Sequence, residues 1–349
     1  MDGCVRVAAS GVRMIRNGLL DWSVMRPAAS RVPRRSPPPL PDDPAGLSRA
    51  AVEAARARGF VAAGVLAASR PVSFERYRAW LEQGFHGEMA YLERDAAARM
   101  RFDAILPFTR SVLAVARAIP GRGPGNVAQY ARGEDYHLVV RRHLKAVIED
   151  LRPLAPRGSN WRVCVDTAPL LERELAARAG LGFIGKNGLL IVPGLGSHVV
   201  LGEILTDVVL APTAAPADPG AYRCGSCTAC LDACPTRAFV APRVLDARKC
   251  LSYLTIEKRT PFTAAEEAAL SGRLFGCDDC QDVCPFNKAR GTGPSGPAAS
   301  VDPGEILALS EEAFRGRFFG SAVWRATPRG LARNAAAALR REARILPTR

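Results

Sequence analysis

The sequence predicts an α/β (α+β) domain, followed by a small cysteine-organised unit and a short helical C-terminal segment. Three observations support this division. Helical stretches alternate with short β-rich runs over residues 46–212. Eight of the ten cysteines fall within residues 213–292, among short, turn-rich connections. The C-terminal segment, residues 293–349, starts within the linker GTGPSGPAAS, and residues 301–349 have the composition of helices.

The folded part is expected to begin near residue 46. Residues 1–45 are rich in Pro and Arg and lack a periodic apolar pattern, which predicts a disordered extension or a misassigned start. In LSRAAVEAARARGF, Ser48 is the expected N-cap of the first helix. YHLVVRRHLKAVIEDL reads as a helix, and SVLAVARAI, WRVCVD and HVVLGEILTDVVL read as buried, β-rich segments. Glu203 and Asp207 interrupt the last of these, so it does not read as a membrane span.

The net charge of +14 is concentrated at the two ends of the chain. Residues 313–349 alone hold nine Arg against one Glu. A basic tail beside a near-neutral body favours a polyanionic partner, nucleic acid first. A solvated Arg-rich tail is the alternative.

The cysteines indicate iron–sulfur clusters. The N-terminus lacks the apolar core of a secretory signal, and the twin arginine Arg34-Arg35 is not followed by an apolar stretch. We therefore expect the cytoplasm, where clustered thiols bind metal more often than they form disulfides. The first run follows the C-x2-C-x2-C-x3-C-P pattern of bacterial ferredoxins, in which the fourth cysteine ligates the other of two clusters. A shorter run ending in Cys-Pro follows it.

This crossover divides eight cysteines into two [4Fe-4S] ligand sets. Two zinc ribbons are the alternative, although a third cysteine at the same step and the trailing Pro fit zinc poorly. Cys4 and Cys164 remain outside the sets. The first set is Cys224, Cys227, Cys230 and Cys284, and the second is Cys234, Cys250, Cys277 and Cys280.

Asp166 is the candidate reactive acid of the first domain. WRVCVDTAPLLERELAARAGLGFIGKNGLLI reads as a strand ending in Asp166, a turn, a helix and a glycine-rich return to a strand. Acids at the carboxyl end of a strand commonly lie where α/β sheets bind ligands. The alternative is that Asp166 only caps the following helix.

An ordered set of motifs resembles the epoxyqueuosine reductase family over residues 46–340. The motifs are HGEMAYLER, YARGEDYH, VDTAPLLER, AGLGFIGKN, GSHVVLGEILTD, VLDARKCLSYLTIE, GCDDCQDVCPFNK and RGLARNAAAAL. The family usually has Trp where Phe183 stands.

The resemblance implies a cobalamin-dependent reductase that acts on tRNA carrying epoxyqueuosine. It implies a corrin in the N-terminal domain, a ferredoxin-like domain with two [4Fe-4S] clusters that feed it, and a C-terminal segment like a truncated helical repeat that contacts tRNA. The family's proton-donating aspartate falls on Asp166, and Arg173 falls on the substrate or tRNA side of the pocket. The expected corrin contacts, besides Asp166, are Arg94, Tyr130, Lys186, Ser197 and Leu201.

Three expectations follow for the mechanism. Burial near the corrin should raise the pKa of Asp166, which suits a general acid for the departing epoxide oxygen. Arg325, Arg329 and Arg333 recur every four residues and should line one helix face that tracks tRNA phosphates. A low-potential electron donor and a monomeric enzyme are expected.

Three other functions share some of these features. A reductive dehalogenase has the same cofactor plan, and a zinc-ribbon module would bind nucleic acid without catalysis. A ferredoxin-type electron carrier would leave the first domain unexplained.

Overall fold

The structure is a computed structural model that describes residues 36–120, 123–213, 223–288 and 300–345. Cys4, most of the predicted N-terminal extension and most of the linker GTGPSGPAAS lie outside the described residues.

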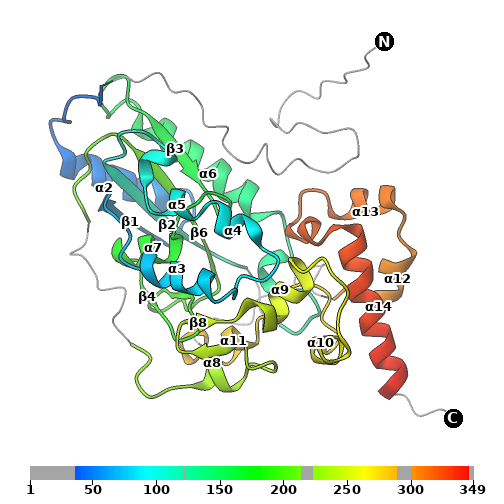
Figure 1. Cartoon of the computed structure of the whole chain (residues 1–349). Helices are drawn as coiled ribbons and strands as arrows, with labels where there is room; N and C mark the ends of the chain where they lie inside the picture. The colour runs from blue at the N-terminus through cyan, green and yellow to red at the C-terminus, as the bar shows by residue number, and fades with distance from the viewer. Residues whose placement is uncertain (1–35, 121–122, 214–222, 289–299, 346–349) are drawn as a thin grey trace.

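A four-stranded antiparallel sheet forms the centre of the first domain, in the order β1-β2-β6-β3 (Figure 1). β2 pairs with β1 on one side and with β6 on the other, and β3 lies at the edge beside β6. The predicted α/β (α+β) class is therefore confirmed in its α+β form. The strands are β1 (Ala62–Ala67), β2 (Ser111–Ala118), β3 (Trp161–Cys164) and β6 (Val199–Thr206).

Helices cover both faces of this sheet. α2 (Pro44–Ala57) and α6 (Tyr136–Leu151) pack together on one face, and α7 (Glu172–Arg178) packs on the other. Successive side chains of a strand point to opposite faces, so a strand covered on both sides must be apolar at consecutive positions. This explains the run VLAVA of β2, in which Val112 meets the α7 side and Leu113 the α6 side.

The helix and strands predicted in this domain are present, but the expected N-cap at Ser48 is wrong. The side chain of Asp43 caps α2 instead, accepting a hydrogen bond from Gly46 N at 2.7 Å. Ser48 lies inside the helix, with its Oγ 2.8 Å from the carbonyl oxygen of Ala211. The connections contain α3 (Phe74–Glu82), α4 (Ala90–Arg94), α5 (Ala96–Arg99), η1 (Phe102–Ala104), η2 (Gln129–Ala131), β4 (Phe183–Ile184) and β5 (Leu190–Ile191).

Short elements build the cysteine-rich part, and a group of helices that ends in the 19-residue α14 follows it. The short elements are α8 (Ala229–Asp232), β7 (Phe239–Ala241), β8 (Val244–Leu245), η3 (Ala247–Lys249), α9 (Leu251–Ile256), α10 (Ala264–Leu270), α11 (Asp279–Asp282) and η4 (Pro285–Asn287). The C-terminal elements are α12 (Pro303–Ala308), α13 (Glu311–Phe318), η5 (Ala322–Ala326) and α14 (Thr327–Ile345).

A segment of the first domain joins the C-terminal core. Val127 forms a parallel bridge with Phe275, and Ala128 N donates to the Phe275 carbonyl oxygen at 2.8 Å. Val127 is buried in one cluster with Phe275 and Trp324. The cysteine-rich and C-terminal parts are thus anchored to the loop that precedes α6.

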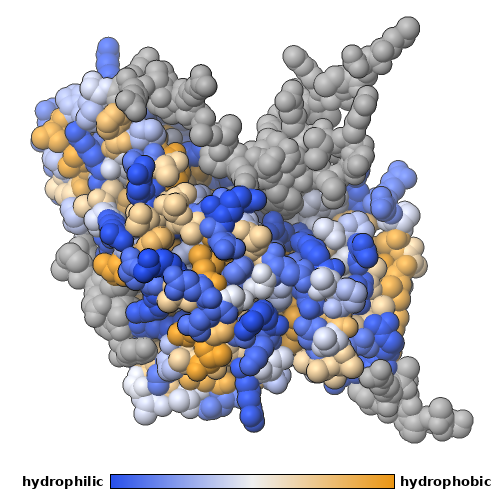
Figure 2. Space-filling view, viewed as in Figure 1, coloured by the Kyte–Doolittle hydropathy of each residue, from blue (hydrophilic) through white to orange (hydrophobic). Residues whose placement is uncertain are grey.

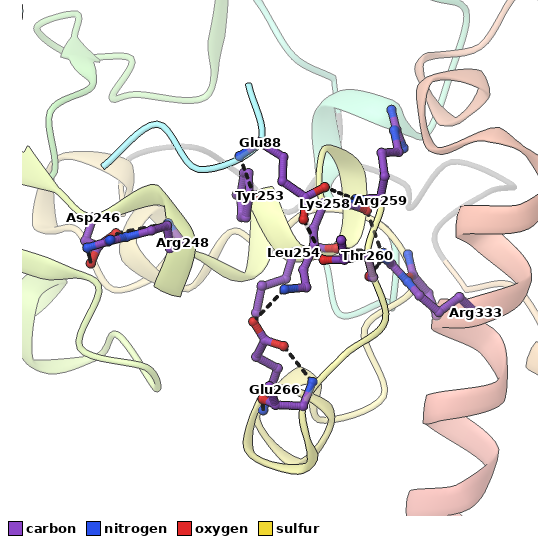
Figure 3. Close-up of polar contacts among 12 residues, drawn as sticks. Glu88, Asp246, Arg248, Tyr253, Leu254, Lys258, Arg259, Thr260, Glu266 and Arg333 are labelled. Carbon is purple, nitrogen blue, oxygen red and sulfur yellow. Dashed lines mark hydrogen bonds and ion pairs between the residues drawn. The ribbon is translucent and has the colours of Figure 1, made fainter. Parts of the chain in front are cut away.

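Arg333 holds α14 against the loop that follows α9 (Figure 3). Its guanidinium donates to the carbonyl oxygens of Leu254, Lys258 and Thr260, each at 2.8 Å. The same group lies 3.9 Å from the centroid of the Phe262 ring. Charged donors to part-buried carbonyls are among the stronger hydrogen bonds, so Arg333 stabilises the attachment of this helix.

The same loop is also bound by the first domain (Figure 3). Glu88, which follows α3, accepts hydrogen bonds from Arg259 N at 2.6 Å and Thr260 Oγ1 at 2.5 Å. Its backbone N–H donates to the Tyr253 hydroxyl at 2.8 Å. The loop therefore couples the position of α14 to that of the first domain.

Replacing Arg333 with Ala should lower the free energy of unfolding by about 2 kcal/mol, because three carbonyls lose a charged donor. Arg329→Ala is the matched control. Arg329 is exposed one turn earlier and has no hydrogen-bond partner among the described residues, so its change should stay within about 0.5 kcal/mol. Urea denaturation measures both values, and equal losses would contradict the role given to Arg333.

The face shown in Figure 2 is predominantly hydrophilic over α3, α4 and α9, with apolar side chains interspersed near β8 and α8. Among the described helices, none combines the length and the apolar character needed to cross a lipid bilayer.

Candidate active site and thiol clusters

Asp166 leaves the sheet two residues after β3 in a strained conformation. Its φ is +52°, in the left-handed region that residues other than glycine rarely adopt. Such strain is common at functional sites. Its backbone N–H donates to Glu172 Oε1 at 2.6 Å. The helix-cap alternative is wrong, because α7 begins at Glu172 and has Leu171 as its N-cap.

The Asp166 side chain is open to solvent although protein groups surround it. It retains 58% of its accessible surface, yet withdrawal of water by the surrounding protein is the largest single influence on its pKa. Arg173 is likewise exposed while its surroundings lower its pKa by desolvation. Its Nη1 donates to the Gly188 carbonyl oxygen at 2.5 Å. Asp166 and Arg173 are thus both open to solvent and closely surrounded by protein, and we call the surface that they border the Asp166 hollow.

His137 connects Asp166 to a second aspartate. Its Nε2 lies 3.1 Å from Asp166 Oδ2, and its Nδ1 lies 2.7 Å from Asp135 Oδ1. Asp135 is buried and also accepts from His137 N at 2.9 Å, so the imidazole is held by its own helix start. Burial opposes a charge on the ring, but the bonds to Asp135 and Asp166 outweigh it and raise the pKa of His137 to about 9. At neutral pH the ring therefore carries two protons.

The expected rise in the pKa of Asp166 is wrong. Burial does act upward, but the hydrogen bond and charge of His137, followed by the charge of Arg325, lower the pKa of Asp166. The acid available at neutral pH is therefore the Asp166–His137 pair, which holds one proton between Oδ2 and Nε2.

Two aromatic rings border this pair. Tyr136 stacks on His137 with ring centroids 4.0 Å apart, and its hydroxyl hydrogen-bonds Asp166. Tyr130 meets Tyr136 edge-on at 5.9 Å and Phe275 at 6.1 Å. Burial raises the pKa of both tyrosines, so both hydroxyls stay protonated at neutral pH.

Two more carboxyl groups lie behind Asp166. Glu203 of β6 is completely buried, and Glu172 approaches it from the start of α7. Burial first, and then the charge of Asp166, raises the pKa of Glu172 to about 7. Burial and the charge of Glu172 raise the pKa of Glu203 further.

The structure brings Cys224, Cys227, Cys230 and Cys284 around one cavity of about 40 Å³. Cys227 is exposed, and Cys284 is buried in a small apolar cluster with Phe183 and Ile191. The Phe183 ring packs edge-on against Phe286 at 5.2 Å. The predicted first ligand set is thus gathered at one place, at the surface of the protein.

The second set is gathered beside the first and lies deeper. The thiols of Cys250, Cys277 and Cys234 all act electrostatically on Cys280. Burial raises the pKa of Cys277 to about 12. Cys230 of the first set also acts on Cys280, so the two sets adjoin.

The second set also adjoins the Asp166 hollow. Gly276, which precedes Cys277, lies so close to Tyr130 that an added Cβ would stand 3.7 Å from its ring. The Asp278 carboxylate accepts from Gln129 N at 2.7 Å. The first thiol set, the second thiol set and the Asp166 hollow therefore lie next to one another, in that order, between the exposed Cys227 and Asp166.

The spacing of the thiols favours clusters over single metal ions. Zn–S bonds of about 2.3 Å bring four sulfur atoms close together around one ion. Four thiols spread around a cavity suit a larger inorganic core, as in a [4Fe-4S] cluster.

The residues predicted to contact a corrin are not gathered at one point. Tyr130 and Leu201 lie on the side of Asp166, and Arg94 is exposed in α4, 3.4 Å from Asp95. Lys186 lines the first thiol cavity, and its Nζ donates to the Gly225 carbonyl oxygen at 2.8 Å.

Ser197 faces the cysteine-rich part. It is buried, its N donates to Asn287 Oδ1 at 2.7 Å, and its Oγ accepts from Asn287 Nδ2 at 3.0 Å. Its Oγ thus holds the segment that follows Cys284 against the start of β6.

The single basic helix face predicted from Arg325, Arg329 and Arg333 is wrong. Arg325 belongs to η5, before α14 begins, and forms a two-point ion pair with Glu257 at 2.9 and 3.0 Å. Arg333 is occupied by three carbonyls, as described above. Of these three arginines, only Arg329 is exposed on α14. Thr327, with a φ of +65°, changes the chain direction between η5 and α14, which a four-residue count does not detect.

Sequence reasoning missed Asp135, His137, Glu172 and Glu203. Asp135 and His137 lie in the motif YARGEDYH, but no local pattern indicates a bond to an acid 29 positions away. The sequence did contain a signal for Glu203, because an acidic residue within an otherwise apolar strand is unusual and can indicate a functional role. Asp207, which directly follows β6, is a structural counterexample, because it accepts from Asn160 N at 2.8 Å and Asn160 Nδ2 at 2.6 Å.

Two family models match the chain. The model described as "4Fe-4S double cluster binding domain" matches residues 223–287. The model described as "Epoxyqueuosine reductase QueG, DUF1730" matches residues 99–167, which include His137 and Asp166. Together with two adjoining thiol sets and an acid pair in an open hollow, the first match defines the class: an oxidoreductase with two [4Fe-4S] clusters.

Known proteins give the family. The chain is 39% identical to the epoxyqueuosine reductase of Pseudomonas aeruginosa over 319 residues, which is 86% of each chain. A crystal structure of epoxyqueuosine reductase with an epoxyqueuosine-modified tRNA stem loop is 30% identical, with a TM-score of 0.75, over 84% of this chain and 81% of that one. The enzyme of Bacillus subtilis, solved with the loop of a catalytic aspartate swung out of the active site, is 29% identical over the same shares, with a TM-score of 0.75. The chain belongs to the epoxyqueuosine reductase family.

Proposed function

We propose that this protein reduces epoxyqueuosine to queuosine at the wobble position of tRNA. The observation that carries the proposal is the Asp166–His137 acid pair, which stands in an accessible hollow beside two adjoining four-thiol sets. Membership of the family indicates the substrate, and we place the reaction in the cytoplasm. The two alternative functions, a reductive dehalogenase and a zinc-ribbon nucleic-acid binding module, do not fit a member of the epoxyqueuosine reductase family.

The two thiol sets are proposed to hold the two clusters. Cys224, Cys227, Cys230 and Cys284 would bind one cluster, and Cys234, Cys250, Cys277 and Cys280 the other. When bound, the clusters supply electrons singly. The exposed thiol of Cys227 favours electron entry from a low-potential donor at the first set.

The residues beside Asp166 fit cobalamin. On the α7 side of β6, Val199 and Leu201 are only partly buried, although Leu205 on the same face is completely buried. Partly covered apolar side chains beside an open hollow suit the flat, apolar edge of a corrin. When bound, cobalamin supplies a reduced cobalt centre as the strong nucleophile that opening an epoxide requires. We propose Leu201 and Tyr130 as contacts, with Arg94, Lys186 and Ser197 at the margin.

Side chains of the protein supply the proton that the departing epoxide oxygen takes up. His137 passes its Nε2 proton to Asp166 through the 3.1 Å contact, and Asp166 donates this proton to the departing epoxide oxygen. Asp135 fixes the ring through the 2.7 Å contact, so that Nε2 faces Asp166. The two neutral tyrosines exclude water from this pair while keeping a hydroxyl available to it.

We propose that the tRNA is held by Arg173, Arg325 and Arg329. Arg173 lies at the hollow, and Arg325 acts electrostatically on Asp166, so both are near the reacting base. Arg329 is exposed and would contact a phosphate. Arg333 supports them by holding α14 in place.

Arg329→Ala should weaken tRNA binding and reduce the salt dependence by about one unit of log Kd per log salt, as expected for one lost phosphate contact. Arg317→Ala is a control, since Arg317 is paired with Glu305 in the first C-terminal helices. Fluorescence anisotropy over a salt series measures the slope, and an unchanged slope would remove Arg329 from the tRNA interface.

Complementation tests the proposed function. In a bacterium that lacks its own epoxyqueuosine reductase, tRNA accumulates the epoxide, and expression of this protein should restore queuosine in digested tRNA. Persistence of the epoxide in spite of soluble, iron-loaded protein would contradict the proposal.

A further inference from the structure

Glu203 is a buried acid that the proposed mechanism does not use. It lies in the middle of β6, opposite Ala114 of β2 and Cys164 of β3. Its residue is 0% exposed, and among the described residues its carboxyl oxygens have no partner at ordinary hydrogen-bond distance; the carboxyl of Glu172 alone comes near enough to share a proton with it. Buried polar groups are almost always partnered, so an unpartnered carboxyl inside a sheet needs an explanation.

The groups around Glu203 give it no counter-charge. On its face of the sheet it meets the carboxyls of Glu172 and Asp166 and the thiol of Cys164. No basic side chain of the described residues is among these neighbours. An isolated buried carboxylate is costly, so Glu203 holds a proton.

Glu172 connects Glu203 to the reacting acid. Its Oε1 accepts the Asp166 backbone N–H at 2.6 Å, and its carboxyl is coupled electrostatically to Glu203, Asp166 and His137. Arg173, the next residue, is its basic neighbour. The carboxyls of Glu203, Glu172 and Asp166 thus follow one another from the interior of the sheet to the Asp166 hollow.

The chemistry requires more protons than the Asp166–His137 pair holds. Converting an epoxide to an alkene breaks both C–O bonds, forms the second C–C bond, and releases the oxygen as water. It consumes two electrons, which the reduced cofactors supply, and two protons. The pair holds one proton, so a second must reach Asp166 before the oxygen can leave as water.

We propose that Glu203 and Glu172 form a proton reserve for the second protonation of the departing oxygen. A proton passes from Glu172 to Asp166, and Glu203 replaces it on Glu172. Both glutamates regain protons from solvent after product leaves. Neither touches the substrate, so both act through Asp166. This inference rests on the proposed function.

The first test does not depend on turnover. Infrared spectroscopy in H2O and D2O should show the C=O stretch of a protonated carboxylic acid at pH 8 in the cluster-loaded protein. Glu203→Gln should abolish it. Glu174→Gln should leave it, because Glu174 is equally buried in α7 but pairs with Arg178 at 3.2 Å and accepts from Val72 N at 2.8 Å. Absence of the band from the unmutated protein would overturn the proposal.

Stability gives a second readout. The folded state binds the Glu203 proton more tightly than the unfolded chain, so rising pH favours unfolding above the usual glutamate pKa. Glu203→Gln removes this dependence. Its Tm should therefore exceed that of the unmutated protein by a margin that grows from pH 5 to pH 8. A margin that does not change with pH would overturn the assignment of a proton to Glu203.

The pH dependence of single-turnover reduction tests the role itself. In the Glu203→Gln variant only Glu172 can store the proton. The Glu172 carboxyl loses this proton as the pH rises through its pKa of about 7. The variant should match the unmutated rate within about twofold at pH 6 and be about tenfold slower at pH 8. A rate ratio independent of pH would overturn the reserve, whereas failure of the unmutated protein to reduce the epoxide would instead overturn the proposed function.

Discussion

Asp166→Asn should reduce epoxyqueuosine turnover by about two to four orders of magnitude, the range that a positioned general acid contributes. The amide has the shape of the carboxyl and can still accept a hydrogen bond from His137 Nε2, now 3.1 Å from Asp166 Oδ2. It cannot carry the proton that the departing oxygen needs. Single-turnover reduction followed by mass analysis of the nucleosides measures the loss.

Cofactor content separates a chemical defect from a structural one. Asp166→Asn should retain its iron and bind cobalamin, since no thiol changes. Asp103→Asn is a control, because Asp103 is exposed and pairs with Arg101 at 3.1 Å. If Asp166→Asn turned over at a rate near that of this control, Asp166 would not be the proton donor.

Cys280→Ala should remove one cluster, leave roughly four irons per chain in place of about eight, and abolish measurable turnover. Cys280 belongs to the deeper thiol set, and a cluster that loses one of four ligands is exposed to loss of iron. Because the two sets adjoin through Cys230 and Cys280, a break in the series stops electron supply to the hollow.

Cys164→Ala is the matched control for the cluster. Cys164 is a buried thiol of β3 that belongs to neither set, and burial raises its pKa. Iron content and turnover should stay near the unmutated values. Equal iron in the Cys280 and Cys164 variants would show that the thiol sets are assigned wrongly.

Local patterns predicted those parts of the molecule in which the ligands or core residues recur at short spacing. The cysteine runs fix three ligands within seven residues, so the thiol sets could be assigned before the structure was known. The apolar runs of β2 and β6 likewise reveal strands covered on both faces. These features depend on neighbouring residues in the chain.

The rest of the site depends on contacts between distant residues. The sign of the Asp166 pKa shift is set by His137, and no spacing relates the two. The role of Arg333 is set by carbonyls of the loop after α9. Periodicity alone gave Arg333 a surface role, because it counts positions and does not show which of them a neighbouring loop covers.

We propose that this protein uses cobalamin and cluster electrons to remove the epoxide oxygen at Asp166. The most direct measurement incubates reduced, iron-loaded protein with epoxyqueuosine-containing tRNA, with and without cobalamin, and determines the digested nucleosides by mass. Loss of one oxygen atom from the modified nucleoside is expected only when cobalamin is present. Equal conversion without cobalamin, or an intact epoxide in the complete mixture, would contradict it.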